Sequence, residues 1–433
     1  MAQPKNYTLT VAITLVIANM IGTGVFTSLG YQVGLLPSGF VIMILWLLGG
    51  VVALSGAFTY AEIATTLKRS GGEYLYLSKI FHPAIGFVSG WMSSVVGFAG
   101  AISAVAIAIG AYATEATGIS TKVIAVVAIV SMSTVHWFGV KTGGRVQTFL
   151  TALKLSLIAF FCIAPFFITG VPKTEIHFLP QPGDWNLMLS SGFAVSLVFV
   201  VYAYTGWNAS AYIAGNLDDA RTNLPKSLII GTLIVVLVYL CLNATFLYTA
   251  TFQELQGQND IGNVVAHKLF GATVGHLFSG VFSFALLSTL SAMTIAGPRV
   301  TEAMGADYKL LQSFSVKNRY QMPYLAILAQ TIWSAFLVLV SSFKEIIQYI
   351  SVSLSIFSML TVAGIFFLRR KNVSDDHFKV PLYPIPPILF IVCTCWMIYY
   401  VAAEDYKIIL YSLATMVPGY ILYFIASHQN KKI

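Results

Sequence analysis

The stretch from Ile17 to Phe26 could bind a charged ligand through its backbone, because Gly22, Thr23 and Gly24 interrupt a charge-free hydrophobic run there. A glycine in a helix interior costs about 1 kcal/mol relative to alanine, and unpaired backbone amides in hydrocarbon are costlier still. Such a break persists where another group satisfies it, and the freed amides of a broken membrane helix suit an anionic group. The glycines could also serve close helix packing alone, and this stretch does not decide between the two.

A second interruption lies half a chain later, at Thr205 and Gly206 within the hydrophobic stretch from Phe199 to Asn208. It repeats the Thr-Gly pair of the first interruption. Corresponding breaks in two halves of a membrane protein indicate a ligand site near the bilayer midplane. The repetition therefore favours a binding site over simple helix packing.

Composition places the chain in the membrane. Its 433 residues are 57% hydrophobic and 9% charged, with a mean hydropathy of +0.81. A soluble domain could not keep its surface hydrated with this balance. Since a span needs about 20 residues, and the first charge-free stretch can hold two, the sequence predicts an all-α polytopic protein of about twelve helices. The stretches are residues 6–61, 83–114, 123–140, 146–172 (interrupted by Lys154), 185–217, 227–253, 269–298, 320–343, 346–368, 380–403 and 408–430.

The two breaks divide these helices into two halves within a single transmembrane domain, residues 1–433. Each half opens with a broken helix, so helices one and six are the broken ones. The first half covers about residues 8–172 and the second about 185–370. Two additional helices follow at 384–430, and because their spans carry no charge we expect them to act as scaffold or oligomer surface.

The distribution of basic residues predicts the orientation. Of the 24 Lys and Arg residues, 18 fall on the side of the N-terminus and five in the opposite loops, with Lys154 inside a span. This asymmetry predicts a cell (inner) membrane protein with both termini in the cytoplasm. The net charge of +8 then reflects topology and gives no reason to expect nucleic-acid binding.

Cysteine and acid placement argues against metal, redox and enzyme chemistry. The four cysteines, Cys162, Cys241, Cys393 and Cys395, all fall within predicted spans, so we expect no disulfide, no metal site and no cofactor. A membrane enzyme would need converging acids or histidines, and Glu62 is the one carboxylate near a predicted span. We therefore expect no enzymatic activity.

Lys154 is a charged residue at membrane depth. It lies nine residues beyond Arg145, about 13.5 Å along a helix and thus near the middle of a roughly 30 Å core. A lysine there costs at least about 2.5 to 3.5 kcal/mol, so we expect it to face the protein interior and hold a carbonyl, a hydroxyl or a shuttled proton. A purely structural role stays open. Tyr239, deep in the seventh span, should either hydrogen-bond an internal partner or serve packing alone.

The first cytoplasmic turn carries acids and bases side by side. We expect Glu62 and Glu73 to pair with Lys68 and Arg69 in a network that closes the cytoplasmic side. The spacing from Ser70 to Glu73 also suits a capping box for the following helix. In the eighth span, small hydroxyls could line a cavity or bridge helices: Ser283, Ser288, Thr289 and Ser291.

Four motifs in this order resemble the L-type amino acid transporter family of the amino acid-polyamine-organocation superfamily. They are Ile21–Phe26, Ser70–Tyr74, Tyr202–Asn208 and Asn223–Pro225, and the resemblance runs from about residue 8 to about residue 370. It implies a five-plus-five inverted repeat, alternating access and sodium-independent transport of neutral L-amino acids, usually by one-for-one exchange. The implied partners are small neutral L-amino acids and the lipid bilayer.

The resemblance also implies site residues. Backbone amides of the first break would bind the substrate carboxylate, and carbonyls of the broken sixth helix its ammonium. Tyr202 stands at the family's aromatic gate, and Lys154 at the position where relatives carry a lysine in place of sodium, with Tyr239 as its companion. The substrate contacts implied in this way are Ile21, Gly22, Thr23, Gly24, Tyr202, Tyr204, Thr205, Gly206 and Asn208.

Several positions depart from the family pattern. Ala214, Gly215 and Asn216 stand where relatives often carry acidic residues, which puts a cytoplasmic gating role there in doubt. Thr205 stands where glycine is frequent, which indicates a smaller side-chain pocket. Residues 112–122 contain no cysteine, so we expect a stand-alone bacterial protein without a disulfide-linked heavy subunit.

Two other functions compete with exchange. A proton-coupled symporter would use Lys154 as its proton-sensing group. A receptor or channel is a weaker alternative, because a channel needs a continuous polar path and the sequence offers two local breaks.

Overall fold

The computed structural model describes residues 7–67, 69–168, 176–258, 260–340, 343–371, 377–404 and 406–430, and almost all of these residues are helical. The α-helices are α1 (Leu9–Met20), α2 (Gly24–Gln32), α3 (Gly39–Leu67), α4 (Glu73–Ile80), α5 (Pro83–Met92), α6 (Ala99–Thr117), α7 (Thr121–Trp137), α8 (Val140–Ile163), α9 (Asp184–Met188), α10 (Ser191–Tyr204), α11 (Ala220–Thr249), α12 (Phe252–Leu255), α13 (Ile261–Asp307), α14 (Tyr324–Val340), α15 (Phe343–Leu368), α16 (Ile385–Glu404) and α17 (Tyr406–Asn430). A π-helix, η1 (Ser93–Phe98), joins α5 to α6, and the 3-10 helices are η2 (Ala164–Phe166), η3 (Ala209–Asn216), η4 (Lys309–Ser315) and η5 (Arg369–Lys371).

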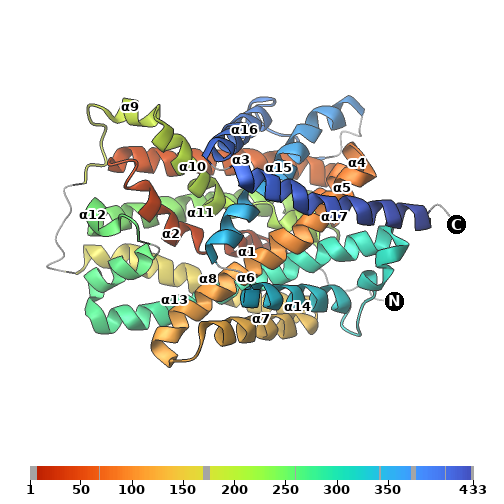
Figure 1. Ribbon diagram of the computed structural model, residues 1–433, viewed down its shortest axis with the longest axis horizontal. Helices are drawn as coiled ribbons and strands as arrows, with labels where there is room; N and C mark the ends of the chain where they lie inside the picture. The colour runs from red at the N-terminus through yellow and green to blue at the C-terminus, as the bar shows by residue number, and fades with distance from the viewer. Residues whose placement is uncertain are drawn as a thin grey trace.

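The predicted twelve-helix membrane architecture is confirmed. Among the described residues, nine helical segments are long and apolar enough to cross a bilayer, and α7, α14 and the Val352–Leu368 part of α15 are shorter apolar helices. Figure 1 shows most of them side by side along the long axis of the molecule, with α5, η1 and α6 crossing the bundle obliquely. In α13 the non-helical Gly271 divides a short first part from the membrane span, Gly280–Asp307.

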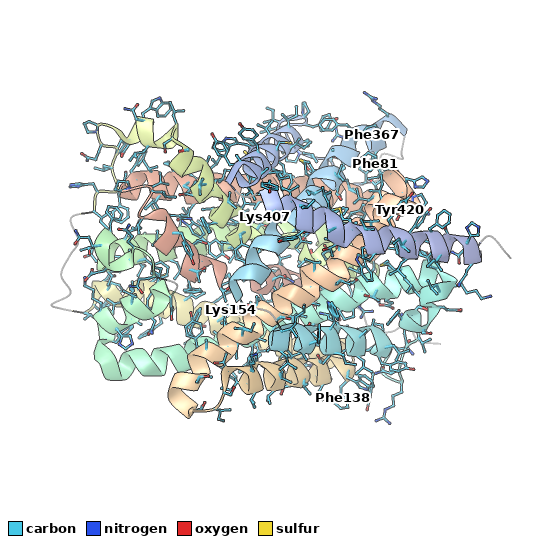
Figure 2. All side chains as sticks on the ribbon, viewed as in Figure 1. Phe81, Phe138, Lys154, Phe367, Lys407 and Tyr420 are labelled. Carbon is cyan, nitrogen blue, oxygen red and sulfur yellow. The ribbon has the colours of Figure 1, made fainter. Side chains whose placement is uncertain are left out.

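The outer surface is apolar, as a lipid-facing surface must be. Phe138, Phe367 and Tyr420 are each about half exposed and lie at the periphery in Figure 2. Lys154, labelled in the same view, has a 1% exposed side chain within the bundle. This inside-out distribution, with large apolar groups outside and a charge-bearing group inside, fits a protein surrounded by hydrocarbon.

The described residues closest to the two termini both contact the C-terminal part of α13. The Asn430 side chain donates to the Asp307 carbonyl at 2.8 Å, and the Arg299 side chain hydrogen-bonds Tyr7. An even number of spans requires this arrangement. Which side of the membrane that end faces stays a prediction.

Both predicted helix breaks are confirmed. Residues 21–23 separate α1 from α2, and residues 205–208 separate α10 from η3. A Cβ atom on Gly24 would lie 2.8 Å from the Ala203 Cα, so glycine allows the start of α2 to touch the end of α10. Gly206 has a φ of 100°, a left-handed conformation that glycine adopts without strain. The sequence therefore places glycine where the two breaks pack against each other and turn.

The predicted pairing of Arg69 with Glu62 or Glu73 in the first cytoplasmic turn is wrong. Glu62 instead accepts two hydrogen bonds from the Arg369 guanidinium, at 2.7 and 2.6 Å. Arg69 pairs with Asp307 at 2.6 Å, and Lys68 lies outside the described residues. The ion pairs thus connect the turn to η5 and to the end of α13, which are distant in sequence, so local spacing could not reveal them.

The predicted capping box is also absent. Gly72 is the N-cap of α4 and makes no side-chain capping bond. The Ser70 hydroxyl instead accepts a hydrogen bond from the Gly215 amide at 2.8 Å. Ser70 therefore ties the turn to η3 rather than starting the helix.

We predict that Gly24→Ala destabilises the protein and that Gly22→Ala does not. The added Cβ meets backbone at position 24, whereas at position 22 its closest neighbour is the Thr289 Cγ2 at 3.7 Å. Overpacking of this kind costs about 1 to 3 kcal/mol. Thermal unfolding in detergent, followed by tryptophan fluorescence, should show a lower Tm for Gly24→Ala alone. Equal Tm values for the two variants would contradict the close approach.

We predict that Arg369→Gln destabilises the protein by about 3 kcal/mol, the lower end for breaking a buried pair because Arg369 itself is partly exposed. The Glu62 side chain is 1% exposed and would lose its counter-charge. The neighbouring Arg370→Gln is the matched control, since Arg370 is exposed. If urea unfolding gave the same free energy for both variants, the Glu62 pair would not stabilise the fold.

Candidate functional site

At the first break, the Met20 and Ile21 carbonyl groups have hydrogen-bond donors but several amide groups lack acceptors among the described residues. The Met20 carbonyl accepts the Gly22 amide at 2.8 Å, and the Ile21 carbonyl accepts two side-chain donors described below. The amides of Thr23, Gly24 and Val25, at the start of α2, have no hydrogen-bond acceptor among the described residues. Helix N-termini expose such amides and carry the positive end of the helix dipole. The break therefore presents donors without acceptors.

Lys154 holds the carbonyl end of the first break. Its Nζ donates to the Ile21 carbonyl and to the Thr289 hydroxyl, both at 2.6 Å, and Thr289 donates to the same carbonyl at 2.8 Å. The predicted interior position, with a carbonyl and a hydroxyl as partners, is confirmed. These bonds join α8, α13 and the end of α1 at one point.

Tyr239 connects the two breaks. Its hydroxyl lies 2.6 Å from the Met20 carbonyl oxygen and 2.8 Å from the Ala203 carbonyl oxygen, so its one proton is shared between the ends of α1 and α10. The side chain is fully buried on α11. Of the two alternatives that the sequence left open for Tyr239, an internal hydrogen bond is therefore the correct one.

The second break offers acceptors. Thr205 satisfies the Tyr202 carbonyl twice, through its amide at 3.0 Å and its hydroxyl at 2.7 Å. The Ala203 carbonyl has Tyr239, but the carbonyls of Tyr204 and Thr205 accept no hydrogen bond within the described ranges. The second break thus complements the first, with acceptors that lack donors.

Both breaks line one cavity with a volume of about 120 Å³. The π-helix η1 adds Ser93, Gly97 and Phe98 to the wall, and π-helical segments are frequent at functional sites. Glu73 is the single charged side chain among the described lining residues. Across the described part of the chain, no group of three or more His, Cys, Asp and Glu residues is arranged to hold a metal ion.

Most of the predicted site residues meet at this cavity. The lining includes Gly22, Thr23, Gly24, Tyr202, Tyr204, Thr205, Gly206 and Asn208. Ile21 does not line it and contributes its carbonyl to Lys154, while Lys154 and Tyr239 lie behind the breaks as supports. The Tyr204 hydroxyl is already used, since it donates to the Trp46 carbonyl at 3.1 Å.

Some lining residues were not predicted. Asn19, one turn before the first break, has a buried side-chain amide nitrogen without a hydrogen-bond partner, and its place in the interrupted run was the available signal. Phe390 and Thr394 bring α16 to the wall, so the expectation that helix eleven is only scaffold is wrong. No local pattern in α16 could have shown this contact.

Comparison with known protein families identifies the family of this chain. The amino acid permease family model matches residues 8–423. The chain belongs to the amino acid permease family. This confirms the predicted resemblance, because the four motifs and the broken helices all lie inside the matched range.

Named relatives are transporters. The chain is 29% identical to the "Serine/threonine exchanger SteT" of Bacillus subtilis (strain 168) over 89% of both chains. It is 26% identical to the mouse (Mus musculus) "b(0,+)-type amino acid transporter 1", over 95% of this chain and 86% of the relative. It is also 26% identical to the human (Homo sapiens) "Large neutral amino acids transporter small subunit 2", over 100% and 82%.

We predict that Tyr239→Phe and Lys154→Ala each reduce amino acid uptake by reconstituted protein at least tenfold. Tyr239→Phe removes the donor of the Ala203 carbonyl, and an unsatisfied buried group costs about 1 to 3 kcal/mol. Lys154→Ala removes the charged donor of the Ile21 carbonyl, which keeps only the Thr289 hydroxyl. Thr289→Ser, which keeps the hydroxyl, should retain uptake. Initial rates normalised to inserted protein test this, and wild-type kinetics in Lys154→Ala would assign Lys154 a purely structural role.

Proposed function

We propose that this permease is a sodium-independent exchanger of small neutral L-amino acids that works by alternating access. The observation that carries the proposal is the pairing of unsatisfied groups in one cavity. The Thr23 and Gly24 amides offer donors to a carboxylate, and the Tyr204 and Thr205 carbonyls offer acceptors to an ammonium. An α-amino acid carries both groups on one carbon, so it satisfies both breaks at once.

The size of the cavity supports a small substrate. Its volume of about 120 Å³ is well below the roughly 300 Å³ at which sites for drug-sized ligands begin. The Thr205 side chain occupies space that glycine would leave free. Alanine, serine and threonine are therefore the proposed substrates, in agreement with the printed name of the Bacillus subtilis relative.

The position of Lys154 supports sodium independence. Its Nζ contacts the Ile21 carbonyl at the negative end of α1, where a metal cation would otherwise be attracted. A covalently attached cationic group at that point removes the need for a dissolved one. Because the lysine stays in place through the cycle, the proposed driving force is the gradient of the amino acids themselves.

The proposal also covers the repeat organisation, the orientation in the membrane and the subunit composition. We propose that the halves at about 8–172 and 185–370 are inverted repeats, with α16 and α17 as additions. The protein lies in the cell membrane with both termini facing the cytoplasm. The protein works without a disulfide-linked heavy subunit, since residues 112–122 hold no cysteine.

We predict that the purified protein in liposomes takes up labelled serine when the lumen is preloaded with unlabelled serine, and that empty liposomes take up at least tenfold less. Exchange requires a substrate for the return step, which explains the difference. Replacing external sodium with choline should leave the rate unchanged. Uptake into empty liposomes that rises with an inward proton gradient would contradict exchange and favour the proton-coupled symporter.

A further inference from the structure

A buried carboxyl group in the cavity wall has no role in the proposed binding of the amino acid backbone. Glu73 is the first residue of α4, outside the candidate membrane spans, and its side chain is 1% exposed. It lines the same cavity as the two breaks. The predicted pairing with Arg69 does not occur, because Arg69 pairs with Asp307, and Lys68 lies outside the described residues.

The two oxygens of Glu73 differ. Oε1 accepts hydrogen bonds from the Tyr60 hydroxyl and the Ser358 hydroxyl, both at 2.7 Å, and from the Asn208 side-chain amide at 3.2 Å. Oε2 is buried and has no hydrogen-bond partner among the described residues. One oxygen is therefore saturated by three different elements, α3, α15 and the second break, and the other is vacant.

Among the described residues, the groups around Glu73 carry no positive charge. Its titratable neighbours are the phenols Tyr60 on α3, Tyr76 on α4 and Tyr212 on η3. Phenols are uncharged at neutral pH. The facing residue on α15 is Ser358, and α5 contains no ionisable residue.

Asp307 and Arg299, two charged residues of α13, have other partners. At the end of α13, Asp307 pairs with Arg69 and accepts the Tyr74 hydroxyl. Arg299 of the same helix pairs with Glu302. The salt bridges found within the described ranges do not include Glu73, so its carboxyl has no fixed counter-charge there.

A buried carboxylate without a counter-charge is unfavourable, and binding a cation relieves it. Burial raises the pKa of the Glu73 carboxyl above its ordinary value, although its three hydrogen bonds partly offset the effect. Oε2 is enclosed in this conformation, and a proton is the one cation that needs no additional space. The geometry thus favours a proton over a bulkier ammonium group as the occupant.

We propose that Glu73 is a proton-binding site of the exchange cycle, protonated at Oε2 while the cavity wall is closed as described here. When the wall opens and water reaches the carboxyl, the Oε2–H bond breaks, the proton passes to water and the electron pair stays on Oε2. Asn208 connects this step to the second break, because it lies in the non-helical segment between α10 and η3. The proposal rests on the proposed exchange function.

The sign of the pH dependence follows from the raised pKa. The closed conformation is favoured below that pKa and is lost as the pH rises through it. Exchange in liposomes with equal internal and external pH should therefore fall by at least fivefold with rising pH between 5 and 9. Glu73→Gln, which is permanently neutral and of nearly the same shape, should lose this pH dependence, so that its exchange rate, whatever its level, changes less than twofold across this range.

A pair of serine variants tests the same site without replacing the carboxyl. Ser358→Ala removes a donor that favours the ionised form, so the midpoint of the pH profile should rise by about one unit. Ser94→Ala is the matched control, because the Ser94 hydroxyl bonds the Gly90 carbonyl and Thr301 and no carboxylate. A merely structural role for Ser358 would change the rate and leave the midpoint where it is.

The outcomes separate this proposal from the proposed function. If preloaded liposomes fail to exchange serine at every pH, the exchange function itself is wrong. If the wild type exchanges serine but Glu73→Gln has the same pH profile, the proton site is wrong and exchange stands. Faster exchange of labelled arginine than of serine at pH 8, lost in Glu73→Gln, would also overturn the proposal, because Glu73 would then pair with a basic substrate.

Proton binding can also be measured without transport. Addition of serine to purified protein in weakly buffered detergent solution, with a pH-indicator dye, should change the bound proton number in the wild type and leave it unchanged in Glu73→Gln. This measurement remains informative if the variant does not reconstitute. An absence of any proton change in the wild type between pH 5 and 9 would contradict the proposal.

Discussion

The structure depends on which side chains hydrogen-bond to the backbone of a broken helix where water is absent. Hydrocarbon offers no hydrogen bonds, so each group released at a break needs a partner inside the protein. Tyr239 is shared by the Met20 and Ala203 carbonyls, and Lys154 with Thr289 serves the Ile21 carbonyl. These side chains satisfy the Met20, Ile21 and Ala203 carbonyls. Among the described residues, the amides that start α2 and the carbonyls of Tyr204 and Thr205 have no hydrogen-bond partner and are left for a ligand.

Steric constraints place the two breaks at one cavity. Gly24 lets α2 touch the end of α10, and the positive φ of Gly206 turns the chain beside Asn19. The π-helix between α5 and α6 then brings Ser93 and Phe98 to the opposite wall. Small residues, a left-handed glycine and a π-helix together make room for the cavity. Each of them places backbone or a small side chain where an ordinary α-helix would place a large side chain. The result is a small cavity with both breaks in its wall.

Local sequence patterns predicted those parts of the molecule that depend on local physics. Charge-free runs predicted the spans, the Thr-Gly pairs predicted both breaks, and depth along a helix predicted that Lys154 faces inward. Features set by tertiary packing were not predictable in this way. Glu62 pairs with Arg369, which lies 307 positions away. Glu73 has no basic partner among the described residues, although Arg69 precedes it closely in sequence. Hydropathy alone could not show that α16 reaches the cavity.

We propose that the amides of the first break without acceptors bind the carboxylate of an amino acid. Isothermal titration calorimetry of the purified protein with L-alanine and with L-alaninamide tests it directly, because the two ligands have nearly the same size and differ at the carboxylate. We predict that L-alanine binds and that L-alaninamide binds at least a hundredfold more weakly. A neutral amide group is a weaker hydrogen-bond acceptor than a carboxylate for the amides at the positive end of α2. Equal affinities for the two ligands would contradict the account.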